Sequence, residues 1–109
     1  MGLDITVTLK RKLHCPKCGE VVGFQIIEEA DSGGRGWYDP LEKIGYYVPY
    51  DQRTEENDWY GKDMVLTEEQ AKILYDYAMQ ESTYNGRRCA SILRTSGNSD
   101  YEIVINADW

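Results

Sequence analysis

The sequence predicts an α+β fold in which one main helix packs on a small antiparallel sheet. Residues 3–13 alternate between apolar and polar side chains, and residues 20–28 form a second strand-like run directly afterwards. Residues 67–82 show helical spacing behind a capping sequence. The expected order is β-β-(short α)-α-β-β, in which the four strands form two hairpins. We expect one domain that spans residues 1–109.

The two predicted helices have clear start signals. Asp39 is suited to cap a short helix over residues 39–45, because Pro40 fits the first helical position. Thr67 and Gln70 have the spacing of a capping box, which predicts the start of the main helix. We expect Asn85-Gly86 to end that helix.

The remaining segments predict turns and strands. Residues 31–36 are rich in glycine and predict a flexible turn. Residues 87–95 alternate in polarity and predict a third strand. Residues 96–100 are then expected to form a hairpin loop that leads into a closing strand over residues 101–106.

A Cys-x-x-Cys knuckle, His14-Cys15-Pro16-Lys17-Cys18-Gly19, connects the first two predicted strands. Its two sulfurs are close enough to bind one metal ion, and the glycine permits the tight turn. A structural zinc ion needs four ligands, and the remaining candidates are Cys89, His14 and a carboxylate. Cys89 can approach the knuckle in the predicted sheet, although nothing in the sequence fixes this. Two alternatives stay open, namely a metal-free turn and a redox dithiol.

The charge and cysteine content narrow the class of protein. Nineteen acidic residues against twelve basic ones give a net charge of −7, which argues against direct binding of nucleic acid. The odd count of three cysteines indicates reduced thiols rather than a secreted disulfide framework. With no apolar run of membrane-spanning length and no signal peptide, a cytoplasmic protein is expected.

The middle of the chain combines aromatic and acidic residues. Seven acids lie between residues 51 and 69, against only Arg53 and Lys62. Tyrosine and tryptophan beside carboxylates are typical of protein interfaces, although the same rings can instead be buried over the sheet. The candidate partner-binding residues are Asp51, Glu55, Glu56, Asp58, Trp59, Tyr60 and Asp63.

No catalytic constellation is apparent in the sequence. His14 is the only histidine, and a neighbouring residue on the same strand points to the opposite face. The many carboxylates lie in polar loop sequence, where ordinary pKa values are expected. We therefore expect a protein that is not an enzyme.

The opening Met1-Gly2-Leu3-Asp4-Ile5, followed by the CPKCG knuckle, resembles small proteins of bacteriophages and prophages. Small acidic phage proteins include anti-CRISPR inhibitors, and several of these mimic DNA charge in the nucleic-acid groove of an RNA-guided nuclease. By size and acidity, this resemblance implies an inhibitor that binds a basic groove of a host protein, in the host cytoplasm. The alternatives are a zinc-knuckle adaptor in phage assembly or transcription and a small CxxC thiol oxidoreductase.

Overall fold

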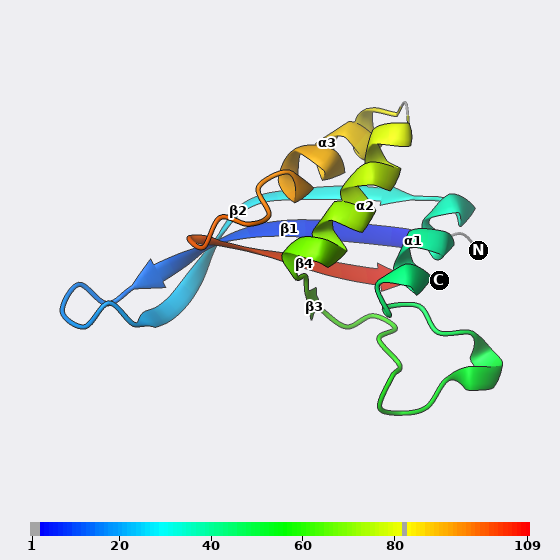
Figure 1. Ribbon diagram of the computed structural model, residues 1–109, viewed down its shortest axis with the longest axis horizontal. Helices are drawn as coiled ribbons and strands as arrows, with labels where there is room; N and C mark the ends of the chain where they lie inside the picture. Colours follow the sequence, from blue (N-terminus) through cyan, green and yellow to red (C-terminus); the bar gives the residue numbers. More distant parts are fainter. Residues whose placement is uncertain (1–2, 82) are drawn as a thin grey trace.

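The computed structural model describes residues 3–81 and 83–109, which fold into one antiparallel sheet with helices on one face (Figure 1). The sheet has the order β2-β1-β4-β3, with β1 (Asp4–His14), β2 (Val21–Gly33), β3 (Met64–Val65) and β4 (Tyr101–Asp108). The helices are α1 (Tyr38–Lys43), α2 (Glu68–Gln80) and α3 (Tyr84–Leu93), with 3-10 turns at Arg35–Trp37 and Tyr50–Gln52. The predicted α+β class, with a main helix packed on an antiparallel sheet, is confirmed.

Strand β1 lies at the centre of the fold. It pairs with β4 from Asp4 to Arg11 and with β2 along its whole length. Ile5, Val7 and Leu9 are buried beneath the helices, as the alternating pattern predicts. The predicted first hairpin is therefore confirmed, but β2 continues to Gly33 and takes up half of the predicted turn at residues 31–36.

The main helix α2 begins where the sequence predicts. The Thr67 hydroxyl accepts a hydrogen bond from the Gln70 N–H at 3.2 Å, and the Gln70 side-chain oxygen accepts from the Thr67 N–H at 3.0 Å. Ala71, Leu74 and Ala78 form the buried face of the helix. The helix ends at Gln80, and the predicted end at Ser82 lies outside the described residues, as do Met1 and Gly2 of the opening motif.

We expect Thr67→Ala to lower the free energy of unfolding by about 1 kcal/mol, because one N–H of the first turn loses its acceptor. Chemical denaturation monitored by circular dichroism measures this loss. Ser99→Ala, a substitution at an exposed residue of the loop before β4, is the control. A denaturation midpoint unchanged from wild type would contradict the role of the capping box.

The predicted strand over residues 87–95 is wrong, because this segment forms helix α3. The Thr83 hydroxyl caps it by accepting a hydrogen bond from the Gly86 N–H at 3.0 Å. Gly86, Cys89, Ala90 and Leu93 are buried, and their spacing is the three-and-four period of a helix. Asn85-Gly86 therefore lies inside a helix instead of ending one, and residues 96–100 connect α3 to β4.

Two smaller differences affect the edges of the fold. Helix α1 begins at Tyr38 with no side-chain cap, so Asp39 does not cap it; the Asp39 carboxylate instead lies 3.3 Å from the Lys43 ammonium. The two-residue strand β3 pairs with β4 and was not predicted, because so short a segment has no periodicity. Among the described residues, no helix has the length and apolar character needed to cross a bilayer.

Candidate functional site

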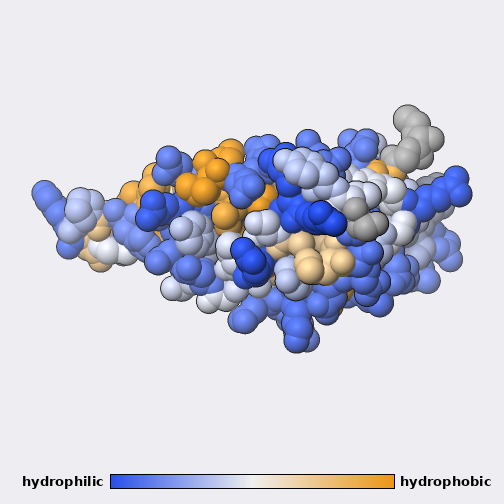
Figure 2. Space-filling view, turned by 90° about the horizontal axis from the view of Figure 1, so that it is seen from above, coloured by the Kyte–Doolittle hydropathy of each residue, from blue (hydrophilic) through white to orange (hydrophobic). Residues whose placement is uncertain are grey.

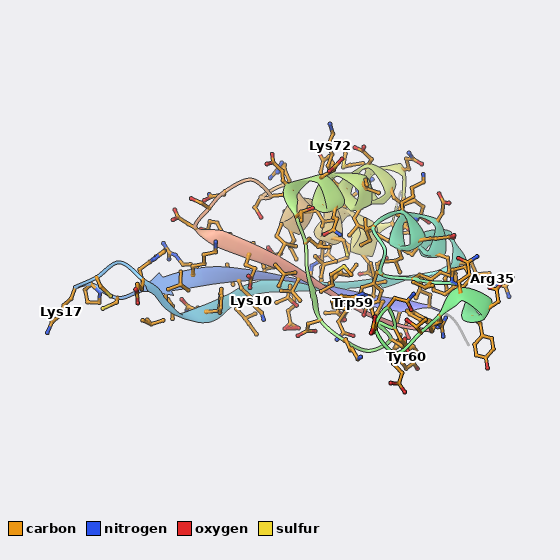
Figure 3. The ribbon with its side chains drawn as sticks, turned by 60° about the horizontal axis from the view of Figure 1, so that its bottom comes forward. Lys10, Lys17, Arg35, Trp59, Tyr60 and Lys72 are labelled. Carbon is orange, nitrogen blue, oxygen red and sulfur yellow. The ribbon has the colours of Figure 1, made fainter. Side chains whose placement is uncertain are left out.

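Residues 48–63, which we call the acidic loop, connect α1 to β3 and contain five of the predicted partner-binding carboxylates. The loop lies at the end of the molecule away from the tip of the β1–β2 hairpin (Figures 1 and 3). It is held to β4 by Tyr46, whose hydroxyl donates to the Lys62 carbonyl oxygen at 2.6 Å and accepts from the Ala107 N–H at 2.8 Å. Both ends of the loop are thus fixed to the core.

Arg53 contacts the body of the protein through its guanidinium group, although the residue also lines the hollow that contains three of the acidic side chains. Its Nε and Nη2 atoms donate to the Val48 carbonyl oxygen at 3.1 and 2.9 Å. Its guanidinium carbon lies 5.3 Å from the centre of the Trp109 ring and 5.8 Å from that of Tyr47. The positive charge of Arg53 therefore lies against internal groups, and none of the described carboxylates forms an ion pair with it.

The carboxylates of the loop face solvent. Asp51, Glu55 and Asp58 line a shallow hollow of about 430 Å³ together with Tyr50 and Arg53. Glu56 and Asp63 are also exposed, and Asp63 accepts a hydrogen bond from the Asn106 amide at 2.8 Å. The predicted acidic residues are therefore gathered on one exposed loop with little positive charge beside them.

The structure divides the aromatic residues between core and surface. Trp37 and Tyr46 are fully buried, and Trp59 is half-buried with its ring centre 6.2 Å from that of Tyr46. Tyr50 is 88% exposed and Tyr60 is 48% exposed. Trp59 therefore contributes mainly to packing, and the exposed rings beside the carboxylates are Tyr50 and Tyr60. Tyr50 was not among the predicted binding residues, although its position next to Asp51 offered the signal.

The knuckle forms the turn between β1 and β2. Gly19 has φ of +75°, and its N–H donates to the Cys15 carbonyl oxygen at 2.8 Å. The Cys15 N–H donates to the Glu20 carbonyl oxygen at 2.8 Å, and His14 Nδ1 donates to the Gly19 carbonyl oxygen at 3.0 Å. These bonds fix the turn and bring Cys15, Cys18 and His14 together at the hairpin tip.

The thiols of Cys15 and Cys18 in the knuckle differ in their surroundings from the thiol of Cys89. The backbone N–H groups of Cys18 and Lys17 and the Cys18 thiol lower the pKa of Cys15 below its ordinary value, because they stabilise its thiolate. Burial raises the pKa of Cys89 to about 12, with a smaller contribution from Glu81 and Asp31. The thiolate of Cys15 is therefore more readily formed than that of Cys89, which is buried in the core.

The structure separates Cys89 from the other predicted metal ligands. Its sulfur lies 3.8 Å from the carbonyl oxygen of Ala30, which pairs with Val7 on β1. The knuckle follows His14, seven residues further along the strand, so roughly 20 Å separates the two places. The prediction that Cys89 shares an ion with Cys15, Cys18 and His14 is wrong, because residues 87–95 form a helix over the core. Among residues 3–81 and 83–109, no group of three His, Cys, Asp or Glu side chains is placed so that it could hold a metal ion.

Sequence reasoning missed an apolar surface on the same hairpin. The exposed apolar side chains are Leu13, Val21, Val22, Phe24, Ile26 and Ile27. Figure 2 shows hydrophobic side chains gathered along the hairpin between its tip and the helices. Leu13, Val21 and Val22 lie beyond Lys12, where β1 pairs with β2 alone, whereas Ile26 pairs with Lys10, which still pairs with β4. The signal was the apolar run at 21–27, which has apolar residues on both faces of the strand.

The protein thus presents an acidic loop at one end and an apolar hairpin carrying two free thiols at the other. The first surface is suited to electrostatic recognition of a basic partner. The second is suited to apolar contact and to thiolate chemistry. Comparisons of this chain with protein-family models, with curated proteins and with solved structures found no match.

Proposed function

We propose that this chain is a non-enzymatic, phage-type protein-binding module whose acidic loop occupies a basic groove of a host nucleic-acid-binding enzyme. One observation carries the proposal: Arg53 is held against Val48, Tyr47 and Trp109, and among the described residues no carboxylate of the loop forms a direct ion pair with it. Here the negative charge is directed outward.

The arrangement supports mimicry of a nucleic-acid strand. Carboxylates spread along an exposed loop attract the lysine and arginine side chains that would otherwise bind phosphates. Charge mainly accelerates association, so lasting contact also requires groups that bury apolar area. Tyr50 and Tyr60 supply such groups, because they are exposed and lie on the same loop as the acids. An RNA-guided nuclease in the host cytoplasm is the partner that this chemistry and the resemblance favour.

The test is a DNA-cleavage assay with a purified RNA-guided nuclease. Wild type is expected to slow cleavage, and the triple variant Glu55→Lys, Glu56→Lys, Asp58→Lys is expected to lose inhibition, because each lysine repels a basic groove. Its melting temperature should fall only slightly: Glu55 and Glu56 are exposed charges that contribute little to stability, and the half-buried Asp58 loses the one hydrogen bond that it accepts from the Tyr60 N–H at 3.1 Å. Inhibition by wild type should also weaken as salt rises.

A matched control separates position from net charge. Glu42→Lys, Asp76→Lys, Asp100→Lys makes the same charge change on exposed residues outside the acidic loop. This variant is expected to retain most of the inhibition. Equal loss in both triple variants would show that only net charge matters, and wild type without effect at any excess would remove the nuclease as partner.

The hairpin supports a second candidate, an adaptor that joins other proteins in phage assembly or transcription. Its exposed apolar residues and its knuckle lie clear of the helices, where a partner has access. Inhibition that survives the triple reversal in the acidic loop would move the binding surface to this hairpin. The lowered pKa of Cys15 also favours a third candidate, a dithiol oxidoreductase, which turnover of a disulfide substrate would reveal.

A further inference from the structure

The hairpin tip carries two free thiols. Cys15 and Cys18 are free thiols on one tight turn, and a structural zinc ion needs four ligands in a tetrahedron. Cys89 is roughly 20 Å away, by strand spacing, and buried against Ala30. His14 donates its Nδ1–H to the Gly19 carbonyl oxygen at 3.0 Å, which stabilises the turn and leaves Nε2 free. Within residues 3–81 and 83–109, no third His, Cys, Asp or Glu completes the site.

We propose that two copies of this chain bind one zinc ion between their hairpin tips, with Cys15 and Cys18 of each copy supplying the four thiolates. Two ligands per chain and four per ion fix the ratio at one ion to two chains. Four thiols each release one proton when the ion binds, which leaves a centre with a net charge of −2. A second copy is the partner that supplies two thiolates in the same turn geometry, and it gives the interface two-fold symmetry.

The shape of the hairpin allows this contact. Beyond Lys12 the two strands pair only with each other, and Figure 1 shows the hairpin extending away from the helices. Two tips can therefore meet without a collision between the bodies of the two copies. The acidic loops, at the opposite end of each chain, remain accessible.

The side chains around the tip fit the proposed centre. Lys17 lies between the two cysteines at the extreme end of the hairpin (Figure 3), so the two copies bring two ammonium groups to a dianionic centre. Leu13, Val21 and Val22 are 42%, 46% and 69% exposed directly behind the knuckle. When two tips meet, these side chains lose contact with water and shield the ion from solvent.

The experiment measures metal content and molar mass together. Reduced protein is stripped of metal, loaded with zinc and examined by light scattering after size exclusion, with zinc measured on the same fractions. One zinc per two chains, a doubled mass, and return to the monomer with a chelator are expected. Cobalt in place of zinc should give the thiolate charge-transfer absorption of a four-sulfur site.

Cys15→Ser and Cys18→Ser are each expected to abolish both metal binding and the mass change. Cys89→Ser makes the same substitution in the core and should leave both unchanged, with Cys89→Ala as its replacement if the serine variant fails to fold. One zinc per monomer would overturn the proposal in favour of a site within one chain. A dimer that persists both in the presence of chelator and in the Cys18→Ser variant would overturn the proposal and indicate pairing through the apolar strands. Protein that binds no zinc would also overturn the proposal.

This outcome is independent of nuclease inhibition. The knuckle variants leave the acidic loop intact, and the loop variants leave both thiols intact. Loss of the zinc dimer with inhibition retained removes only the shared metal site. Loss of inhibition with the zinc dimer retained removes only the function proposed for the acidic loop.

Discussion

Trp37→Ala is expected to lower the free energy of unfolding by about 3–5 kcal/mol. Trp37 is fully buried, and its ring packs edge-on against Tyr77 with 4.6 Å between ring centres. Removing the indole leaves a cavity where α1, α2 and the sheet meet, and the surrounding side chains close it only in part. Since a domain of this size is stable by about 5–15 kcal/mol, this one substitution removes a large share of the total.

Urea denaturation monitored by circular dichroism measures this loss, and Trp37→Phe is the matched control. Phenylalanine keeps most of the ring volume, and it also removes an indole N–H for which no described residue acts as acceptor. Burying an unpaired N–H is unfavourable, so the phenylalanine variant should lose clearly less stability than the alanine variant. Equal losses in the two variants, or an alanine variant within about 1 kcal/mol of wild type, would contradict the assigned role. If the alanine variant does not fold, a folded phenylalanine variant still separates the two.

Tyr46→Phe is expected to cost about 1–3 kcal/mol, because its hydroxyl has two backbone partners in the core. Without the oxygen, the buried Ala107 N–H loses its acceptor at 2.8 Å and the Lys62 carbonyl oxygen loses its donor at 2.6 Å. The same substitution removes one of the contacts that hold the C-terminal end of the acidic loop, so amide exchange near Lys62 should accelerate. Tyr60→Phe is the control, since that residue lies on the same loop with its side chain half exposed.

The pH dependence of stability gives a second measurement on Tyr46. Burial raises the pKa of the Tyr46 hydroxyl, and the nearby Asp63 carboxylate adds to the shift. The folded state therefore holds the proton more tightly than the unfolded state. Its stabilising effect is complete below the unfolded pKa of about 10 and is lost as pH rises toward the folded value. Tyr46→Phe should flatten this alkaline decline; no flattening would show that Tyr46 ionises as readily in the folded state as in the unfolded state.

Some alkaline loss of stability should remain in the Tyr46→Phe variant, because other buried groups also titrate. Burial also raises the pKa values of Tyr77 and Cys89, so both groups contribute a decline of the same sign. The Cys89 contribution begins near the ordinary thiol pKa and extends to about 12. A residual alkaline slope in Tyr46→Phe is therefore expected, and Cys89→Ala should reduce it further.

The sequence by itself determined the elements whose signals are local. The alternation in residues 3–13 specified β1, because side chains two apart lie on the same face of a strand. Thr67 and Gln70 specified the start of α2, because both hydrogen bonds of a capping box lie within four residues. The knuckle specified its own turn, since its hydrogen bonds join neighbouring residues. In each case the pattern and the interactions that it predicts occupy the same short stretch of chain.

Only the tertiary structure decided what depends on distant residues. Residues 87–95 fit both a period of two and a helical period, and burial against β2 and β1 selected the helix that carries Cys89 away from the knuckle. The contact with Trp109 places the charge of Arg53 against the body of the protein. The pairing of β1 with β4 ends at Arg11, so the tip of the apolar hairpin stays uncovered. These outcomes follow from packing between segments far apart in sequence, and the free energy of such contacts leaves no periodic trace in the segment itself.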